Sequence, residues 1–318
     1  MSIKIIGMGR GIPEKIVSND DLAKFLDTDD EWITTRTGIK TRHVCTTESL
    51  TDLSVTASNQ AIKNANISIG NIDLIICATI SGDYRTPSHS CTVAEQLGAS
   101  CPAFDINAAC TGFVYALDMA AAYIETKRAK HILIICAEMM SSQADWTDRN
   151  TCILFGDGAA ACVVTKGNVI KYMSLSAIPE TTILNLPTDT GNSPFIIDKK
   201  EKNYLYMQGQ EVFKFAVNIV GKDVKEALES LNISPEQIDY YVLHQANKRI
   251  IDSIRVRLKQ PEGKFPININ KYGNISSVSV PLLLSEMLEE GKIKKGDKLF
   301  ISAFGAGLTA GSCILEWE

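Results

Sequence analysis

The stretch AIKNANISIGNIDLIICAT at residues 61–79 recurs as ALESLNISPEQIDYYVLHQ at residues 227–245. Each copy has a helical pattern, then an Asn-Ile-Ser turn, then an apolar run of strand length. The identical positions share one offset of 166 residues; they are Ala61 and Ala227, Asn66 and Asn232, Ile67 and Ile233, Ser68 and Ser234, Ile72 and Ile238, and Asp73 and Asp239. A second pair, FGDGAAACVV (155–164) and FGAGLTAGSCIL (304–315), ends each copy with a glycine-rich strand, and its second member has two extra residues. This spacing indicates an internal duplication and not a short-period solenoid.

Strand-like apolar runs alternate with helical patterns through both copies, as in DLIICAT, HSCTVAEQLG, HILIICAE and VFKFAVNIVGKDVKEALESL. Such alternation predicts parallel sheets with helices on both faces. We therefore expect two similar α/β halves, residues 1–165 and 166–318, packed against each other. Each is close to the roughly 150 residues of a usual folding unit. The stretch 176–205, with its Pro, Thr, Asn and Gly, is expected to form a long surface loop or flap.

The composition is that of a soluble globular protein, with 45% apolar and 22% charged residues. The net charge of −5 argues against a general attraction to nucleic acid or to anionic membranes. The first apolar run, in MSIKIIGMGRGIPEK, is too short for a signal peptide, and no later run reaches the length of a membrane span. We therefore expect a cytoplasmic protein that binds neither nucleic acid nor membrane.

The nine cysteines indicate a reducing compartment, because their number is odd and several lie inside apolar runs such as LIICAT. No pair has CxxC spacing, and the four histidines are scattered. We therefore expect no metal site.

One cysteine has a different setting, in DINAACTGFVYAL at residues 105–117. Cys110 stands where a strand gives way to a helix, and the residues around it are small. Unpaired backbone N–H groups and the positive end of the helix dipole at such a position favour the thiolate. A cysteine more often only fills space, as we expect of Cys77 and Cys136. The setting of Cys110 predicts a nucleophile instead.

Two further polar residues occupy comparable positions in the second half. His244 ends the strand IDYYVL, and in doubly wound sheets ligands gather at the carboxyl ends of strands. Asn274 follows a glycine in NKYGNISSVSVPLLLSEM, just before another helix. Alone, the histidine could be structural and the asparagine an N-cap. Together with Cys110 they form a Cys, His and Asn set, and each member lies at a strand-to-helix passage.

At this point the chain resembles a known family along almost its entire length: the β-ketoacyl-acyl carrier protein synthase III family of the thiolase superfamily. The stretches that carry the resemblance are DTDDEWITTRTGIKTRH (27–43), CPAFDINAACTGFVYAL (101–117), TDRNTCILFGDGAAA (147–161), MQGQEVFKFAV (207–217), HQANKRI (244–250) and YGNISSVSVP (272–281). The resemblance implies a thiolase-like five-layered αβαβα fold, a homodimer, and an active site between the two halves. It also implies Cys110, His244 and Asn274 as the catalytic triad.

The implied reaction is the decarboxylating condensation of an acyl-CoA primer with malonyl-acyl carrier protein, which initiates fatty acid biosynthesis. Cys110 carries the acyl group, and His244 and Asn274 donate hydrogen bonds to the malonyl thioester. The N–H groups of Cys110 and Ala306 form the oxyanion hole, although many relatives have glycine at the latter position. Phe304 shields the acyl-cysteine from water. Acyl-CoA is a substrate, so the resemblance implies no resident cofactor.

The resemblance also implies a binding site for coenzyme A. Trp32 and Arg149 hold the adenine, Arg36 and Thr28 meet the phosphates, and Gly209 and Asn247 line the pantetheine arm.

The acyl pocket is assigned, again by resemblance, to Thr86, Met140, Leu154, Leu205 and Phe213. Some relatives have a phenylalanine at the position of Thr86, where it caps the pocket across the dimer interface. The smaller side chain leads us to expect a deeper pocket that accepts branched or longer primers beside acetyl-CoA.

An acidic carrier protein requires a basic surface on this acidic chain. The helix NKRIIDSIRVRLKQ has an apolar stripe formed by Ile250, Ile251, Ile254 and Leu258. Its opposite side has basic residues, diluted by Asp252. We expect the docking surface to consist of Lys214, Arg249, Arg255 and Arg257.

Other enzymes with a reactive cysteine fit less well. A papain-type hydrolase also uses Cys, His and Asn, but its C-G-[SA]-C-W signature is missing and the duplication is unexplained. Thiolases proper need a second catalytic cysteine, and Cys313 lies inside the closing strand. Asn274 argues against hydroxymethylglutaryl-CoA synthases, which use glutamate, and against elongating ketosynthases, which use two histidines. Chalcone-synthase-like enzymes share the triad but are longer. A specialised acyltransferase or ketosynthase of secondary metabolism remains an open alternative.

A binding-only module has no positive support. IIGMGRGIP has Ile12 where a dinucleotide fingerprint needs its third glycine, and FGDGAAA lacks the lysine of a P-loop.

Overall fold

A computed structural model describes residues 3–191, 193–200 and 203–318. The strands of the first half are β1 (Ile3–Gly11), β2 (Lys15–Ser18), β3 (Thr41–Val44), β4 (Leu74–Ala78), β5 (Ala103–Ile106), β6 (His131–Met139) and β7 (Asp157–Lys166). Those of the second half are β8 (Ile170–Glu180), β9 (Leu184–Asn185), β10 (Tyr206–Met207), β11 (Tyr240–Leu243), β12 (Lys298–Gly305) and β13 (Gly307–Glu316).

The α-helices are α1 (Asn19–Leu22), α2 (Asp30–Thr37), α3 (Leu50–Asn64), α4 (His89–Leu97), α5 (Gly112–Glu125), α6 (Gly209–Leu231), α7 (Lys248–Leu258), α8 (Ile269–Tyr272) and α9 (Ser279–Glu289). Short 3₁₀ turns that matter below are η1 (Ile69–Asn71), η2 (Ala109–Thr111), η4 (Pro235–Gln237) and η6 (Ser276–Val278). In the described part of the chain no helix is long and apolar enough to cross a membrane.

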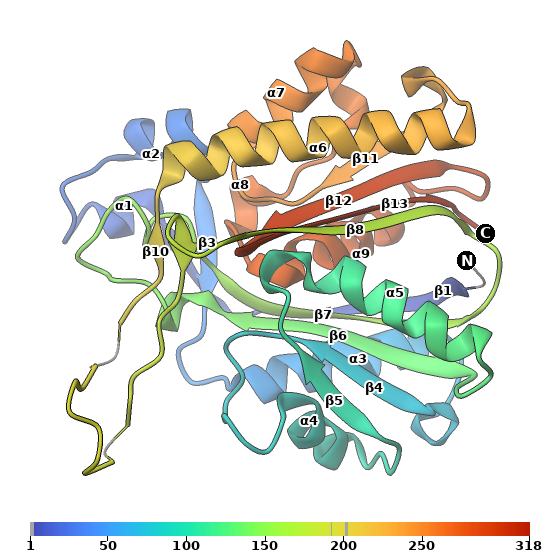
Figure 1. The fold of residues 1–318 in the computed structure, drawn as a ribbon, viewed down its shortest axis with the longest axis horizontal. Helices are drawn as coiled ribbons and strands as arrows, with labels where there is room; N and C mark the ends of the chain where they lie inside the picture. The colour runs from blue at the N-terminus through green and yellow to red at the C-terminus, as the bar shows by residue number, and fades with distance from the viewer. Residues whose placement is uncertain (1–2, 192, 201–202) are drawn as a thin grey trace.

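Five layers stack in the order helix, sheet, helix, sheet, helix (Figure 1). Helices α5 and α9 lie between the two large sheets, and their apolar side chains join both sheets in the largest core cluster. A second cluster packs α3 and α4 on the outer face of the first sheet, and a third packs α6 and α7 on the outer face of the second. The expected αβαβα fold is therefore confirmed.

The duplication is visible in both topology and local geometry. The first large sheet has the order β1-β7-β6-β4-β5. The second has the matching order β8-β13-β12-β11, and the described part of the chain has no counterpart of β5 there. Asn66 and Asn232, which follow α3 and α6, have nearly equal left-handed φ angles of 54° and 52°, a conformation that asparagine tolerates better than most residues. Ser68 and Ser234 then each close a capping box over η1 and η4. The repeated Asn-Ile-Ser turn therefore has one structure in both halves.

The expectation of parallel sheets was wrong for one strand in each half. β4 runs parallel to β5 and β6, and β11 runs parallel to β12. However, β7 is antiparallel to both of its neighbours, and so is β13. Parallel neighbours need a crossover of a dozen or more residues, whereas only Ala306 separates β12 from β13.

The irregular stretch 176–205 is only partly a loop. Strand β8 continues to Glu180, and the short strands β9 and β10 pair with each other. The segment between β9 and β10 projects from the body of the molecule at the lower left of Figure 1. Its residues nearest to these strands form one wall of the cavity described next.

Candidate active site

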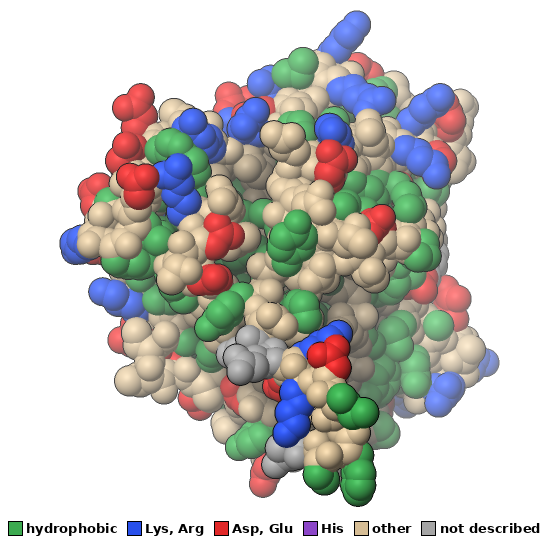
Figure 2. All heavy atoms as spheres, turned by 60° about the vertical axis from the view of Figure 1, so that its left-hand side comes forward, with side chains coloured by type: hydrophobic (Ala, Val, Ile, Leu, Met, Phe, Trp, Pro, Cys, Tyr) green, Lys and Arg blue, Asp and Glu red, His purple; other side chains and the backbone are tan. Residues whose placement is uncertain are grey.

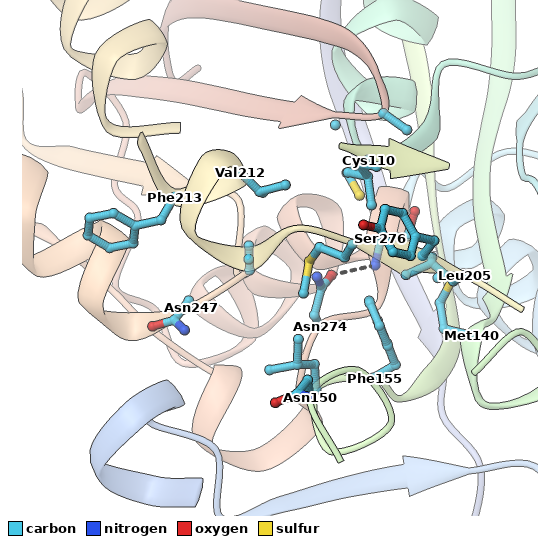
Figure 3. Close-up of a pocket in the computed structure, with 18 of the residues that line it drawn as sticks. Cys110, Met140, Asn150, Phe155, Leu205, Val212, Phe213, Asn247, Asn274 and Ser276 are labelled. Atoms are coloured by element: carbon cyan, nitrogen blue, oxygen red, sulfur yellow. Dashed lines mark hydrogen bonds between the residues drawn. The ribbon is translucent and has the colours of Figure 1, made fainter. Parts of the chain in front are cut away.

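A cavity of about 1490 Å³ is lined by residues from both halves. Cys110 reaches it from η2, His244 from the segment after β11, and Asn274 from the segment between α8 and η6. Figure 3 shows Cys110, Asn274 and Ser276 close together, with Asn247 and Phe213 on the opposite side of the view. The fold therefore gathers the predicted Cys, His and Asn set around one hollow.

Cys110 lies two residues before the start of α5, in a tightly packed turn. Ala109 has a φ of +46°, a strained value for a residue with a Cβ. The backbone of Gly305 packs directly on this turn, because a Cβ added there would stand 2.8 Å from the amide nitrogen of Cys110. The sulfur is thus held between the start of α5 and the end of β12.

The pKa of Cys110 is raised, contrary to the expectation that its position favours the thiolate. Burial raises the pKa of the Cys110 thiol to about 12, and the nearby Glu138 carboxylate adds to that rise, while a hydrogen bond with the Ser276 side chain opposes it. Loss of hydration between the two sheets outweighs the helix N-terminus at this position. The resting thiol is protonated, so its attack on a substrate requires a proton acceptor.

His244 is buried and electrically neutral. Its backbone N–H donates to the carbonyl of Ser302 across the sheet, at 2.8 Å. Neither ring nitrogen has a hydrogen-bond partner among the described residues, and the ring contacts Phe304 edge-on at 5.3 Å between centroids. Burial lowers the pKa of His244 to about 3. A neutral imidazole that lines a cavity can donate one N–H to a ligand.

Asn274 is oriented by its own backbone and by Ser276. Its N–H donates to the carbonyl of Leu154 at 2.8 Å, and its carbonyl accepts from the N–H of Gly156 at 3.2 Å. The side-chain oxygen Oδ1 accepts from the N–H of Ser276 at 2.9 Å, the dashed line in Figure 3. With Oδ1 occupied in this way, the amide nitrogen Nδ2 is left as the donor that faces the cavity.

Two other predicted residues lie at the same end of the cavity. Phe304 is buried and its ring packs edge-on against both His244 and Phe215. Ala306 lines the cavity between β12 and β13 and does not have a positive φ, so its Cβ introduces no backbone strain. The alanine at a position where relatives have glycine is therefore compatible with this turn.

The mouth of the cavity contains Trp32, Arg36, Gly209 and Asn247 from the predicted coenzyme A site. The guanidinium groups of Arg36 and Arg149 lie 4.5 Å and 4.9 Å from the centre of the Trp32 ring. Arg149 and Thr28 themselves are outside the cavity lining.

Arg149 also pairs with the carboxylate of Asp27 at 3.2 Å. An adenine between Trp32 and Arg149 therefore requires the guanidinium to move away from the ring.

The predicted acyl-pocket residues are divided by the structure. Met140, Leu154 and Leu205 line the cavity, and Figure 3 shows Met140 and Leu205 on the side away from Asn247. Phe213 also lines it, but on the Asn247 side, where the guanidinium of Arg249 lies 5.8 Å from its ring centre. Thr86 is exposed and does not line the cavity of a single chain.

The predicted docking residues fall into two groups. Lys214 and Arg249 are exposed and line the cavity mouth. Arg255 instead pairs with Asp252 at 3.9 Å, and Arg257 donates to the carbonyl of Val217 at 3.4 Å. Figure 2 shows Lys and Arg side chains interspersed with Asp and Glu over the upper part of the face turned forward.

A buried carboxylate that no sequence pattern singled out lies beside the predicted nucleophile. Glu138 ends the apolar run HILIICAE, and its side chain accepts hydrogen bonds from Ser276 and Ser277. An acidic residue inside so apolar a run was the available signal, because a carboxylate is rarely buried without a specific reason. Among the described residues, no group of three or more His, Cys, Asp or Glu side chains is placed to hold a metal ion.

Two family models match the chain. The model of 3-oxoacyl-[acyl-carrier-protein] synthase III matches residues 104–178, and the model of the C-terminal part of the same enzymes matches residues 228–317. A beta-ketoacyl-[acyl-carrier-protein] synthase III from Clostridium acetobutylicum is 44% identical, and the match covers 99% of both chains. The chain belongs to this synthase III family.

Solved structures of synthase III proteins share the fold. The crystal structure of the Aquifex aeolicus 3-oxoacyl-[acyl-carrier-protein] synthase III has a TM-score of 0.92 and 42% identity, and the match covers 99% of this chain and 100% of that one. The priming β-ketosynthase of the R1128 polyketide pathway has a TM-score of 0.90 and 32% identity, with 99% and 96% covered.

Proposed function

We propose that this member of the synthase III family condenses an acyl-CoA primer with malonyl-acyl carrier protein. The products are carbon dioxide, free coenzyme A and a β-ketoacyl-carrier that enters fatty acid synthesis. The proposal rests on one observation: the Cys110 thiol, the His244 imidazole and the Asn274 carboxamide come from three distant segments and line the same cavity.

In the first half-reaction the Cys110 sulfur attacks the acyl-CoA carbonyl and forms a covalent thioester. The developing oxyanion is stabilised by the backbone N–H groups of Cys110 and Ala306, which approach each other because Gly305 packs on the Cys110 turn. The thiol gives up its proton as it attacks, since it is protonated at rest.

In the second half-reaction the malonyl thioester replaces coenzyme A. His244 and the Nδ2 group of Asn274 donate to its carbonyl and stabilise the enolate that forms as carbon dioxide leaves. Both donors are neutral at pH 7, because burial lowers the pKa of His244 to about 3 and an amide does not titrate. Each such donor contributes about 3–4 kcal/mol in the transition state. The enolate carbon then attacks the acyl-cysteine, which Phe304 screens from water.

The ligands enter from the mouth of the cavity. Trp32 and Arg149 bind the adenine, Arg36 and Thr28 the phosphates, and Gly209 and Asn247 the pantetheine arm. The exposed cations Lys214 and Arg249 attract the acidic carrier, and Arg255 and Arg257 extend this surface along α7. Both substrates are thioesters, and the reaction uses no resident cofactor.

The acyl group occupies the end lined by Met140, Leu154 and Leu205. We expect branched and longer primers to be accepted beside acetyl-CoA, with Thr86 facing the pocket of a second chain. Support for a homodimer comes from the projecting segment, where Phe195 and Ile197 are 89% and 101% exposed. Exposed apolar side chains of this size are usual at interfaces. The compartment is the cytoplasm, in keeping with the nine free cysteines.

The test is a condensation assay with malonyl-carrier and acetyl-, isobutyryl- and octanoyl-CoA. We expect turnover with acetyl-CoA and with at least one larger primer; a strict preference for acetyl-CoA contradicts the deeper pocket. Cys110→Ser removes acylation, whereas Asn274→Ala still acylates but no longer decarboxylates malonyl-carrier. Absence of any condensation by folded enzyme refutes the proposal. The similarity to a polyketide priming ketosynthase supports one alternative, a specialised ketosynthase of secondary metabolism. This alternative predicts activity only with a specialised carrier protein.

A further inference from the structure

Glu138, the penultimate residue of β6, is a fully buried carboxylate without a cationic partner among the described residues. Four donors surround it. Its Oε2 accepts from the N–H of Ile80 at 3.1 Å and from the hydroxyl of Ser81 at 2.8 Å. Its Oε1 accepts from the hydroxyls of Ser276 at 3.1 Å and Ser277 at 3.0 Å. All four partners donate, which fits the two acceptor oxygens of an ionised carboxylate, although burying that charge still costs several kcal/mol.

Ser276 connects this carboxylate to the sulfur of Cys110. An ionised carboxylate can only accept, so the Ser276 hydroxyl donates its hydrogen to Glu138. Its oxygen lone pairs remain free to accept the Cys110 proton, and Figure 3 shows Ser276 beside Cys110. Ser276 also lines the cavity, and its N–H holds the Oδ1 of Asn274. One residue therefore contacts two members of the proposed triad and the buried acid.

We propose that Glu138, acting through Ser276, takes up the Cys110 proton when the sulfur attacks acyl-CoA. This inference rests on the proposed function. The thiol hydrogen passes to the oxygen of Ser276 while the Ser276 hydrogen passes to Oε1 of Glu138. The sulfur lone pair forms the new bond to the acyl carbon, and the bond from that carbon to coenzyme A breaks. The proton then returns along the same path to the leaving coenzyme A sulfur. Glu138 does not touch the substrate, so it is a positioning residue.

The charges around the site favour Glu138 over His244 as the acceptor. Burial raises the pKa of Glu138 to about 7, whereas burial lowers the pKa of His244 to about 3. The carboxylate is therefore the stronger base of the two. The other titratable groups near Glu138 are thiols, Cys77 on β4 and Cys136 on β6, whose pKa values burial raises well above the usual range. Protonation of Glu138 also removes a negative charge close to the sulfur while that sulfur attacks.

The experiment measures single-turnover acylation of Cys110 by acetyl-CoA between pH 5.5 and 9.5, with intact-protein mass spectrometry as the readout. Four variants are compared with the wild type: Glu138→Gln, Glu138→Asp, Ser276→Ala and Ser277→Ala. Ser277→Ala is the matched control. Ser277 also donates to Glu138, but the second neighbour of its hydroxyl is the carbonyl of Ala78, at 3.2 Å, and not Cys110. Thermal unfolding establishes that each variant is folded.

We expect the wild-type rate to fall as the pH drops below about 7, where Glu138 becomes protonated. In the Glu138→Gln and Ser276→Ala enzymes this fall in rate below pH 7, the acid limb of the profile, is absent. Their Cys110 is acylated at least tenfold more slowly at pH 7.5, and the rate rises with hydroxide concentration up to pH 9.5. Glu138→Asp restores part of the limb, and Ser277→Ala keeps it.

A Glu138→Gln or Ser276→Ala enzyme with the wild-type pH profile overturns the inference. Equal losses in Ser276→Ala and Ser277→Ala also overturn it, since they mean that Glu138 only holds the fold. If wild-type Cys110 is not acylated at any pH, the proposed function fails instead.

Discussion

Gly305→Ala tests the packing that holds the nucleophile in place. The added Cβ would stand 2.8 Å from the Cys110 amide nitrogen, 3.2 Å from its Cβ and 3.3 Å from the Cβ of Ala109. Contacts of a Cβ below 3.0 Å are essentially never seen in proteins, and most exceed 3.4 Å. The closest contact is to backbone, so a rotamer change cannot relieve it. Either β12 or the Cys110 turn has to move by about half an ångström.

Two consequences follow from that displacement. Overpacking of a buried site costs about 1–3 kcal/mol of the free energy of unfolding. Misplacement of a reacting atom by less than 1 Å, together with loss of the paired oxyanion donors, lowers the acylation rate about 10²-fold. Gly263→Ala is the matched control, because its added Cβ meets nothing within 4 Å and its φ is not positive. We expect Gly263→Ala to stay within about 0.5 kcal/mol of the wild type.

The assay combines urea unfolding with the rate at which Cys110 is acylated by acetyl-CoA. Gly305→Ala should fold, with reduced stability and much slower acylation. Acylation at the wild-type rate in Gly305→Ala would refute the claim that close packing of β12 on this turn sets the geometry of the nucleophile.

Three further predictions concern charge and ligand binding. Burial raises the pKa of Asp223 to about 7, so its ionisation opposes folding increasingly from pH 4 to 7. Asp223→Asn should therefore raise the free energy of unfolding by about 2–4 kcal/mol at pH 8 but not at pH 4. The control Glu229→Gln, at an exposed position of the same helix, should not raise it at either pH. Burial lowers the pKa of His244 to about 3, so acid protonates this histidine first in the unfolded chain. Stability therefore falls as the pH drops from 6.5 towards 3, and His244→Gln should abolish about 2 kcal/mol of that loss at pH 5, which chemical unfolding at pH 5 and 7 measures. Trp32→Ala should raise the KM for acyl-CoA about tenfold with little change in kcat; an unchanged KM contradicts an adenine site at this ring.

Most of the fold could be predicted from the duplication, because a turn that recurs at one constant offset is expected to have the same local structure in both halves. Asn66 and Asn232 illustrate this with their matching left-handed φ angles. The direction of a strand could not be predicted from the repeat, because the apolar pattern of β7 is the same whether the strand runs parallel or antiparallel to its neighbours. The single-residue connection at Ala306 becomes informative only when both flanking strands are known to pair.

The residues of the site were easier to predict than their electrostatics. Cys110, His244 and Asn274 could be selected because each stands at a strand-to-helix passage. The pKa of Cys110 depends on how two sheets exclude water from η2, and no local pattern records that. Glu138 was missed because its partners Ser276 and Ser277 lie 138 and 139 residues further along the chain.

The most direct test of the account is the location of the acyl group after incubation with acetyl-CoA. The protein has nine free cysteines, and proteolytic peptide mapping by mass spectrometry distinguishes them. The account predicts one acetyl group per chain, on the peptide that contains Cys110. An acetyl group on another cysteine, or none on folded protein that binds acetyl-CoA, would contradict it.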